Sequence, residues 1–335
     1  MKKSLLMAAL AAAVVGGALG GGKPDSLTWK SGATTVTLKD GTLTVSGKGA
    51  MEDYVLEWEE DARANSSAVW NHAGLSITAV VIGEGVTYIG ENAFRELCFV
   101  PALTSITVAA DNAHYSSENG VLFNKNKTTL IQYPKGKRQD SYIIPNSVTT
   151  IGKRAFFCCW KLASVTIPNS VTHIGERAFS SCGGLTSITI PSSVKTIGIM
   201  AFNGCDNLTS VTIENGVTTI ESAAFYYCRS LMSITFPKSV TSIGLTAFEH
   251  CANLTSITVL NPRPPEFGFP YVFSNTAANL YVPARSYFAY RAADGWNEFD
   301  IKVIVTAYEV IALGILSALL LSAAVFVIVK KSRSR

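Results

Sequence analysis

The sequence contains one 23-residue unit five times in succession between Val148 and Val259. In the unit V-x-x-I-G-x-x-A-F-x-x-C-x-x-L-x-S-I-T-I-P, the apolar positions recur while most polar positions drift. A fixed period of this length is typical of a solenoid, in which like residues of successive coils stack on one another. One coil cannot bury its own apolar side, so its neighbours must cover it. The recurring columns include Phe156, Phe179, Phe202, Phe225 and Phe248; Cys159, Cys182, Cys205, Cys228 and Cys251; and Leu162, Leu185, Leu208, Leu231 and Leu254.

Each unit ends in a short alternation of apolar and polar residues that predicts a β-strand. Within Leu185–Ile190, Ile188 and Ile190 point to one side of the chain, whereas Ser187 and Thr189 point to the other. Stacking of the units therefore predicts a parallel sheet with one buried side and one exposed side.

The middle of each unit is expected to form a single short helical turn. Ala201, Phe202, Cys205 and Leu208 follow the spacing i, i+1, i+4, i+7, which predicts an apolar helical stripe. A glycine such as Gly198 lies between the two parts, where the chain must turn sharply. The expected fold class is an α/β solenoid with a parallel β-sheet face and 23-residue repeats.

This unit resembles the leucine-rich repeats of the BspA-like family, the type 5 class of bacterial and protist surface proteins. VIGEGVTYIGENAF (81–94) looks like the entry repeat of that family, and the segment 115–137 is similar to its β-hairpin-like insert. GTLTVSGKGAMEDY (41–54) resembles the N-terminal β cap, and 280–296 resembles the closing segment. The resemblance implies a leucine-rich repeat fold and a role in adhesion or protein interaction at a cell surface.

These features predict eight successive segments. In order, they are a signal peptide (1–20), an N-terminal β cap (21–79), a first leucine-rich repeat (80–108), a β-hairpin-like insert (109–145), five regular repeats (146–259), a C-terminal cap (260–303), a transmembrane helix (304–329) and a basic cytoplasmic tail (330–335).

Both ends of the chain predict contact with a membrane. The first 20 residues have two lysines, an apolar run from Leu5 to Val15 and a small-residue exit, as secretory signal peptides do. Val310–Val329 carries no charge, is long enough to span about 30 Å of hydrocarbon, and is followed by KKSRSR. The basic tail predicts a single-pass protein whose C-terminus is cytoplasmic. The ectodomain is then expected at the cell surface or in the periplasm, and the C-terminal helix is either a permanent anchor or a sorting signal removed later.

The charge balance argues against a nucleic-acid partner. The formal net charge of +4 includes six basic residues in the two terminal segments, and without them 22 basic residues face 24 acidic residues. No basic surface is therefore expected on the part between these segments.

No catalytic, cofactor or metal motif is present, and the chain is predicted not to be an enzyme and to need no cofactor. The four histidines form no H-E-x-x-H, and no G-x-S-x-G, P-loop or C-x-x-C occurs. Glu52 and Asp53, and the acidic residues of 57–61, are interpreted as a solvated surface. A surface hydrolase using two of these carboxylates remains a remote alternative.

Five of the seven cysteines occupy one column of the repeat, within the expected apolar stripe. Neighbouring coils lie about 4.8 Å apart, so distance alone does not exclude disulfides between them. Equivalent side chains point in parallel, however, which favours buried, unpaired thiols that pack as small apolar groups.

The outward polar columns and the aromatic residues of the loops are the candidate contact residues. The columns contain serine and threonine, which suit an exposed sheet simply through β-propensity, a binding platform for protein or glycan, or a surface that orders water. Trp160, Tyr226 and Tyr227 are residue types favoured at interfaces. The candidate ligand-binding residues are Ser187, Thr189, Ser210, Thr212, Ser233, Thr235, Trp160, Tyr226 and Tyr227.

The sequence therefore predicts an exported, membrane-anchored repeat protein that displays a binding surface for protein or glycan on another cell or matrix. The alternative is a structural envelope scaffold without an external ligand. The sequence does not specify the oligomeric state.

Overall fold

The computed structural model describes residues 26–54, 77–94, 103–268, 271–274 and 276–305. The chain divides into two compact units, residues 1–138 and 139–335. The predicted signal peptide, the basic tail and nearly all of the predicted membrane helix lie outside the described residues. Within the described ranges, no helix is both long enough and apolar enough to cross a bilayer.

The N-terminal unit is built around a sheet whose strand order is β1-β2-β3-β5-β7. The antiparallel strands β1 to β3 precede the parallel strands β5 and β7, because short turns permit hairpins whereas parallel pairing needs a crossover. Val36, Leu43, Val45, Val80 and Ile106 are fully buried on one side of this sheet. The strands are β1 (Leu27–Ser31), β2 (Thr34–Lys39), β3 (Thr42–Gly47), β5 (Ala79–Ile82) and β7 (Ser105–Val108).

Two further groups of strands complete this unit. β4 (Gly49–Ala50) pairs in parallel with β6 (Val86–Tyr88). The antiparallel strands β8 (Tyr115–Glu118), β9 (Val121–Asn124) and β10 (Thr129–Gln132) lie in the segment expected to form a hairpin-like insert. Asn119 and Gly120, between β8 and β9, both have positive φ (49° and 76°), as a two-residue hairpin turn of this composition requires.

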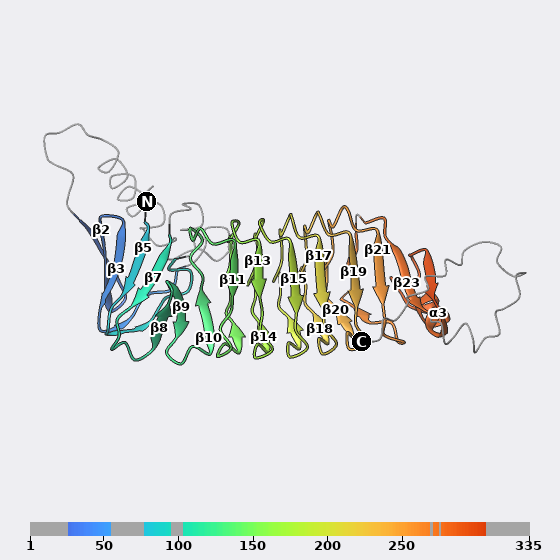
Figure 1. The fold of residues 1–335 in the computed structure, drawn as a ribbon, viewed down its shortest axis with the longest axis horizontal. Coiled ribbons are helices and arrows are strands. Elements are labelled where there is room, and N and C mark those ends of the chain that lie inside the picture. The colour runs from blue at the N-terminus through green and yellow to red at the C-terminus, as the bar shows by residue number, and fades with distance from the viewer. Residues whose placement is uncertain (1–25, 55–76, 95–102, 269–270, 275, 306–335) are drawn as a thin grey trace, which may run out of the picture. The chain divides into compact units, whose positions relative to one another are not determined.

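The C-terminal unit is a β-solenoid in which each 23-residue repeat contributes one strand to each of two rows of parallel strands (Figure 1). In the first row, Ser187 pairs with Ser210 and Thr189 with Thr212, so like residues do lie side by side. The first row contains β11 (Ser141–Ile143), β13 (Ser164–Thr166), β15 (Ser187–Ile190), β17 (Ser210–Ile213), β19 (Ser233–Phe236), β21 (Ser256–Val259), β23 (Asn279–Pro283) and β24 (Ile301–Ile304). The second row contains β12 (Thr150–Ile151), β14 (His173–Ile174), β16 (Thr196–Ile197), β18 (Thr219–Ile220), β20 (Ser242–Ile243) and β22 (Glu266–Phe267).

The expected helical turn in each repeat is wrong: this side of the coil is a ladder of tight turns. Phe179 N–H donates to Ala201 O at 2.7 Å, and Ser181 N–H donates to Asn203 O at 2.7 Å, so these amides bond to the next coil. In an α-helix, each of these N–H groups would instead donate to the carbonyl oxygen four residues earlier in the same coil. Arg177 and Ser181 have φ of 53° and 60°, which also excludes right-handed helix. The helical content of the described C-terminal unit is η2 (Ala284–Ser286) and α3 (Tyr287–Ala292), so the α/β class is not supported there.

A continuous column of phenylalanine rings fills the interior of the repeats, as the period predicts. Successive rings stack nearly parallel, with centroids 4.8 Å apart for Phe156 and Phe179, 5.0 Å for Phe179 and Phe202, and 5.2 Å for Phe202 and Phe225. Phe248 continues the column at 5.1 Å, and all five rings are fully buried. Aromatic contacts at these distances stabilise beyond the burial of area. The ring column therefore holds consecutive coils in register.

Glycine occupies one position in four of the five regular repeats, with Glu221 in the remaining one, and at Gly198 two coils approach closely. A Cβ on Gly198 would lie 2.6 Å from Ile174 O and 2.9 Å from Gly175 C. The backbone at Gly198 lacks the positive φ that would itself demand glycine, so the close approach of the preceding coil, and not the turn geometry, favours glycine at this position.

The last strands close the solenoid. Tyr290 of α3 is fully buried and its hydroxyl donates to Asn261 O at 2.8 Å, while Trp296 Nε1 donates to Pro265 O at 2.9 Å.

Ile304 is the final residue of β24, so the membrane helix predicted to begin at this residue starts too early. The rest of that predicted helix lies outside the described residues.

Candidate functional site

The outward side of the first row presents two columns of hydroxyl groups. Alternation along each strand buries the apolar side chains and exposes the polar ones, because successive side chains of a strand point to opposite sides. Ile188 and Ile190 are buried on β15, whereas Ser187 and Thr189 are exposed. The candidate residues that the structure exposes in this way are Ser187, Thr189, Ser210, Thr212, Ser233 and Thr235.

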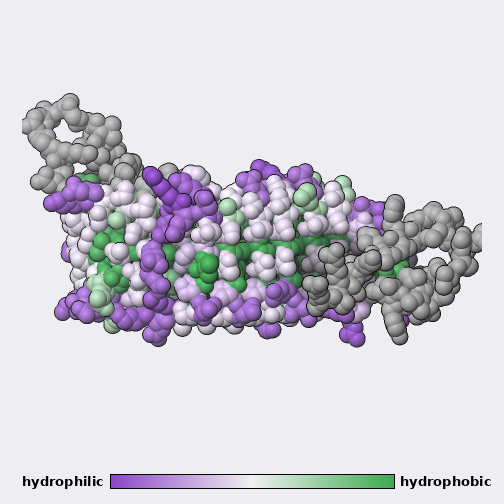
Figure 2. All heavy atoms as spheres, in the orientation of Figure 1, coloured by the Kyte–Doolittle hydropathy of each residue, from purple (hydrophilic) through white to green (hydrophobic). Residues whose placement is uncertain are grey.

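No charged side chain interrupts this hydroxyl surface on β13, β15, β17, β19 or β21. Beyond it, Ile143 of β11 continues the threonine column at one end and is 73% exposed. Tyr281 of β23 continues it at the other end, where Lys302 Nζ lies 5.9 Å from the tyrosine ring centroid. Figure 2 shows a largely white surface with a narrow green band over the repeats, between purple edges. We name the six exposed candidate hydroxyl residues, together with the strands that carry them, the hydroxyl face.

Threonines that directly precede strands of the first row hydrogen-bond to the backbone of the preceding coil. Thr209 Oγ1 donates to Thr186 O at 3.1 Å, and Thr255 Oγ1 donates to Met232 O at 3.3 Å. Met232 occupies the same column but has no hydroxyl group, and its side chain is 56% exposed. In the five regular repeats this column contains Ala163, Thr186, Thr209, Met232 and Thr255, so Met232 is its one large apolar side chain.

Tyr226 and Tyr227 lie on the turn ladder, on a different part of the coil, where they form an aromatic cluster with His250. The tyrosine rings meet edge to face with centroids 4.5 Å apart, and His250 stacks on Tyr227 at 4.5 Å with an interplanar angle of 6°. The Arg229 guanidinium lies 4.9 Å from the centroid of the Tyr227 ring. Asp206 lies 3.6 Å from an Arg229 nitrogen and orients the guanidinium. We name Tyr226, Tyr227, Arg229 and His250 the aromatic cluster.

Sequence reasoning identified the two tyrosines but missed His250 and Arg229. His250 lies 23 residues after Tyr227, so the repeat period itself could have placed it beside this tyrosine. Partial burial and then the hydrogen bond with Tyr227 raise the pKa of Tyr226, so its hydroxyl stays neutral at physiological pH. The cluster therefore presents the neutral Tyr226 phenol and the Tyr227 ring beside one guanidinium.

Trp160 is a separate exposed aromatic residue. Its side chain is 46% exposed, and Lys161 Nζ lies 5.0 Å from the ring centroid. Trp160 occupies the same position of its repeat as Arg229, three repeats earlier. The structure thus does not bring Trp160 into the aromatic cluster.

The cysteine column is buried, as predicted, and its sulfur atoms bond to the backbone of the preceding coil. Cys182 Sγ lies 2.9 Å from Phe156 O, and Cys205 Sγ lies 3.2 Å from Phe179 O. The same contact recurs at Cys228 and Cys251. Cys182, Cys205, Cys228 and Cys251 are free thiols, and Cys98 lies outside the described residues.

We expect this column to make stability fall at high pH. Burial raises the pKa of the Cys205 and Cys228 thiols well above the ordinary value, and that of Cys251 to about 12. The unfolded chain releases these protons near the ordinary value of 9.0, so the folded state binds more protons above that pH. The stability that the thiols contribute is complete below pH 9 and is lost as the pH rises toward 12. Urea unfolding of the purified protein at several pH values should show this decline.

Cys251→Ala is the matched variant for this measurement. Its unfolding free energy should fall less steeply above pH 9 than that of the unaltered protein, because one raised pKa has been removed. Equal slopes for the two proteins would contradict the assignment to the thiols.

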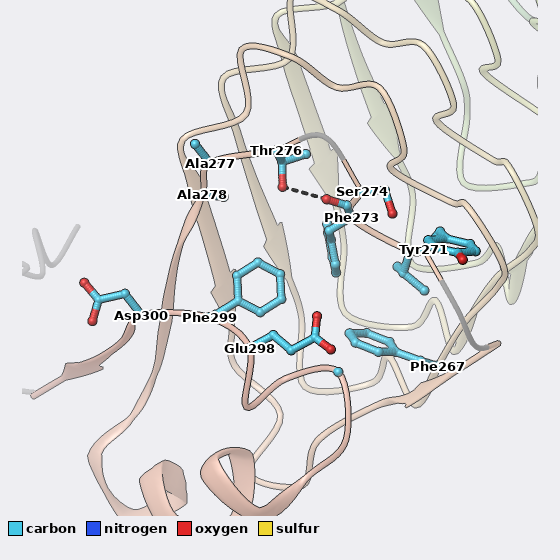
Figure 3. Close-up of a pocket in the computed structure, with 12 residues that line it drawn as sticks. Phe267, Tyr271, Phe273, Ser274, Thr276, Ala277, Ala278, Glu298, Phe299 and Asp300 are labelled. Atoms are coloured by element: carbon cyan, nitrogen blue, oxygen red, sulfur yellow. Dashed lines mark hydrogen bonds between the residues drawn. The ribbon is translucent and has the colours of Figure 1, made fainter.

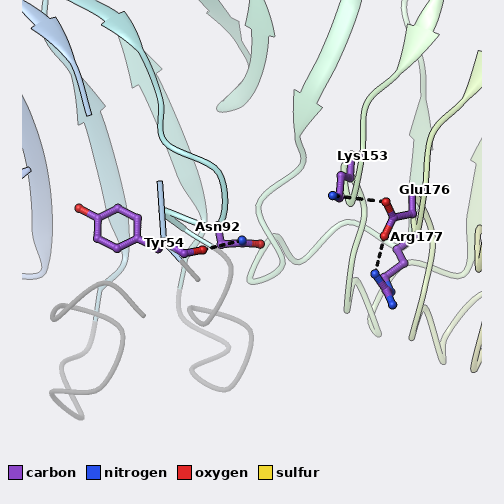
Figure 4. A network of polar contacts seen from close by, with 5 residues as sticks. All are labelled: Tyr54, Asn92, Lys153, Glu176 and Arg177. Atoms are coloured by element: carbon purple, nitrogen blue, oxygen red, sulfur yellow. Dashed lines mark hydrogen bonds and ion pairs between the residues drawn. The ribbon is translucent and has the colours of Figure 1, made fainter. Parts of the chain in front are cut away.

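Polar side chains elsewhere in the described units make structural contacts. In the C-terminal unit Glu176 pairs with Lys153 at 3.3 Å and also with Arg177 (Figure 4). In the N-terminal unit Asn92 Nδ2 donates to Tyr54 O at 2.7 Å, which the same figure shows. These contacts tie turns together within each unit.

Asp53, one of the predicted acidic surface residues, has the same structural use, whereas Glu52 is exposed. Asp53 Oδ1 accepts from Tyr88 OH at 2.8 Å and from Glu91 N–H at 2.6 Å. The acidic residues of 57–61 lie outside the described ranges. Within those ranges, no three His, Cys, Asp or Glu side chains are grouped so that they could hold a metal ion.

Comparison with known proteins identifies the repeat region. Residues 131–255 match six copies of a family described as the BspA type leucine rich repeat region. No curated protein matches the chain.

Solved structures of several bacterial proteins are similar to this chain. A leucine-rich repeat protein from Eubacterium ventriosum is 22% identical with a TM-score of 0.49, over 75% of this chain and 95% of its own. A leucine rich cell surface protein from Faecalibacterium prausnitzii is 21% identical with a TM-score of 0.45, over 74% of this chain and 98% of its own. The pneumococcal vaccine antigen PcpA is 20% identical with a TM-score of 0.45, over 76% of this chain and 56% of its own.

Proposed function

Because residues 131–255 form a BspA-type leucine-rich repeat region, we propose that this chain is a non-enzymatic binding protein that acts outside the cytoplasm. Its repeats contact a protein or glycan on another cell or on the surrounding matrix. The observation that carries this proposal is the hydroxyl face, which is exposed, regular and uncharged over its three strands, β15, β17 and β19.

The chemistry of the hydroxyl face suits a polar ligand without strong net charge. Each serine or threonine hydroxyl both donates and accepts hydrogen bonds, as sugar hydroxyls and peptide groups require. Short side chains also lose little conformational entropy when a ligand covers them. Pairing of Ser187 with Ser210 and of Thr189 with Thr212 repeats the same donors and acceptors from coil to coil, so an extended partner can use several coils at once.

The aromatic cluster and Trp160 are proposed as secondary contacts. Tyrosine, tryptophan and arginine dominate the energetics of many protein interfaces. Tyr227 is already held between the Arg229 guanidinium and the His250 ring, so a partner would pay little to order it.

The two termini support a location outside the cytoplasm. The N-terminal 20 residues have the composition of a signal peptide, and the apolar segment before KKSRSR is long enough to anchor the chain in a membrane. We propose a single-pass protein whose repeats lie at the cell surface or in the periplasm and whose basic tail is cytoplasmic.

Charged side chains placed on the hydroxyl face should abolish attachment. We expect cells that display Ser210→Arg/Thr212→Arg to attach to immobilised glycans, matrix proteins or host cells at least about tenfold less well than cells with the unaltered protein. Two desolvated guanidinium groups would have no partners in the contact, which is the physical reason. Attachment is counted as bound cells per area after washing.

Thr196→Arg/Thr219→Arg is the matched control, because these threonines are half-buried on the second row of strands. This variant should attach normally, and protease treatment of intact cells should release the repeats of all three proteins equally. If deletion of the gene leaves attachment unchanged but weakens the envelope, the protein is a structural scaffold and the binding proposal is wrong.

A further inference from the structure

A pocket lies at the C-terminal end of the repeats, apart from the hydroxyl face and the aromatic cluster. It has a volume of about 420 Å³, which falls in the range of small-ligand sites. Phe267, Tyr271, Phe273 and Phe299 line it together with Glu298 (Figure 3). These residues follow the last regular repeat, so the 23-residue period does not predict their arrangement.

The aromatic walls of the pocket are fixed by packing. Phe273 stacks on Phe248 at 5.3 Å and is therefore the last ring of the interior column. Phe299 meets the Phe273 ring at 5.5 Å with an interplanar angle of 85°. Phe267 packs on Trp296 at 4.3 Å. The rings therefore hold their orientation before any ligand enters.

A glycine gives the Phe267 ring its space. Gly295 has a φ of 76°, and a Cβ at this position would lie 2.5 Å from Phe267 Cδ2. The left-handed backbone and the close contact both require glycine here. The pocket wall thus depends on a residue without a side chain.

One carboxylate points into the pocket. Figure 3 shows the Glu298 carboxylate between the rings of Phe267 and Phe299, whereas Asp300 points away from them. Asp300 pairs with Lys302 Nζ at 3.8 Å. Among the described residues no ion pair involves Glu298, and no basic side chain lines the pocket.

We propose that this pocket binds the ammonium group of an alkylamine, with the alkyl chain against the phenylalanine rings. The faces of aromatic rings attract a cation, and Glu298 supplies the opposite charge at the same place. An anion would face this carboxylate without any basic group. A neutral alcohol would gain apolar contact but no charge attraction. The ligand chemistry is shared by free alkylamines and by the side chain of lysine in a partner protein.

Titration of the purified full-length chain with n-butylammonium chloride tests the proposal, with binding followed by saturation-transfer NMR. For so small a ligand we expect a Kd of about 1–10 mM, because few atoms make contact. 1-Butanol should bind at least about fivefold more weakly, since it has the same apolar chain without the charge. Equal affinities for the two compounds, or no saturable binding of n-butylammonium, would overturn the proposal.

Three variants separate the pocket from non-specific association. Glu298→Gln should weaken n-butylammonium binding by about three- to tenfold, and Phe299→Leu by about threefold, because the leucine keeps apolar volume without the ring. Glu266→Gln removes the same charge from an exposed position of β22 outside the pocket and should leave the affinity unchanged. An equal loss in Glu266→Gln and Glu298→Gln would mean that only the overall charge matters, which contradicts a specific site.

The source of the ammonium group is distinguished by a second titration. Nα-acetyl-lysine N-methylamide should bind at least as well as n-butylammonium if the pocket takes a lysine side chain of a partner. Binding of n-butylammonium alone would assign the pocket to small free amines. Failure of both ligands would leave the attachment role of the hydroxyl face untouched, because the two sites share no residue.

Discussion

Replacing Phe202 by alanine is expected to lower the free energy of unfolding by about 3–5 kcal/mol. The ring is fully buried between Phe179 and Phe225, with centroids 5.0 and 5.2 Å away. Its removal leaves a cavity that the two flanking coils cannot close without leaving their register, so both the transfer free energy and the ring contacts are lost. Urea unfolding monitored by circular dichroism measures the change.

Phe288→Ala is the matched control, because Phe288 is 81% exposed on α3. Its unfolding free energy should change by no more than about 0.5 kcal/mol. A loss in Phe202→Ala no larger than that in Phe288→Ala would show that the ring column does not hold the coils together.

Replacing Gly198 by alanine is expected to destabilise the protein by about 1–3 kcal/mol, although it adds a single methyl group and Glu221 occupies the equivalent position of the next repeat. The new Cβ would lie 2.6 Å from Ile174 O and 2.9 Å from Gly175 O. Both atoms belong to the backbone of the preceding coil, so neither can rotate away as a flexible side chain would. The two coils would have to separate, which strains the hydrogen bonds between them, such as those from Arg177 N–H to Ile199 O and from Phe179 N–H to Ala201 O. The fall in stability is measured as a lower melting temperature in thermal unfolding.

Gly183→Ala shows whether the destabilisation comes from the steric clash at position 198 or from replacing any glycine of the repeats by alanine. No atom lies within 4 Å of the position that its Cβ would take. This variant should keep its stability within about 0.5 kcal/mol or gain slightly, since alanine restricts the unfolded chain more than glycine does. Similar melting temperatures for the two variants would contradict the close approach at Gly198.

The period of the sequence was sufficient to predict the stacked coils, the ring column and the exposed hydroxyls. Each of these follows from repetition: Phe179 can contact Phe202 only if each coil lies on the next one. The alternation from Ser187 to Ile190 also determines which side chains are buried and which are exposed, because every second side chain of the strand must point to the core. The exposure of the hydroxyl face therefore needed no knowledge of the tertiary structure.

The helical turn was predicted wrongly because apolar spacing alone does not distinguish a helix from a series of tight turns. Ala201, Phe202 and Cys205 do point inward, as a helical stripe would. The deciding residues are Arg177 and Met200, whose positive φ is unusual outside glycine, asparagine and aspartate. Hydrogen bonds from each turn to the next coil stabilise this backbone. The sequence of a single repeat contains no pattern from which these bonds could be predicted.

Of the candidate sites, the aromatic cluster follows the 23-residue period, whereas the C-terminal pocket does not. Tyr227 and His250 could have been paired from their 23-residue separation, whereas the C-terminal pocket could not. Phe273 lies 25 residues after Phe248, out of the period, and Phe299 comes from the segment after α3. Only packing of the closing segment brings these rings beside Glu298.

The near-constant separation of the stacked rings sets a fixed increment of growth for this molecule. Phe156, Phe179 and Phe202 are 4.8 and 5.0 Å apart, so duplication of one unit in the gene would lengthen the protein by about one such step. Each added step would widen the area available to a partner by one serine and one threonine, while the terminal segments stayed as they are. Reach, and with it avidity, could thus change by recombination between copies without any new side chain having to evolve.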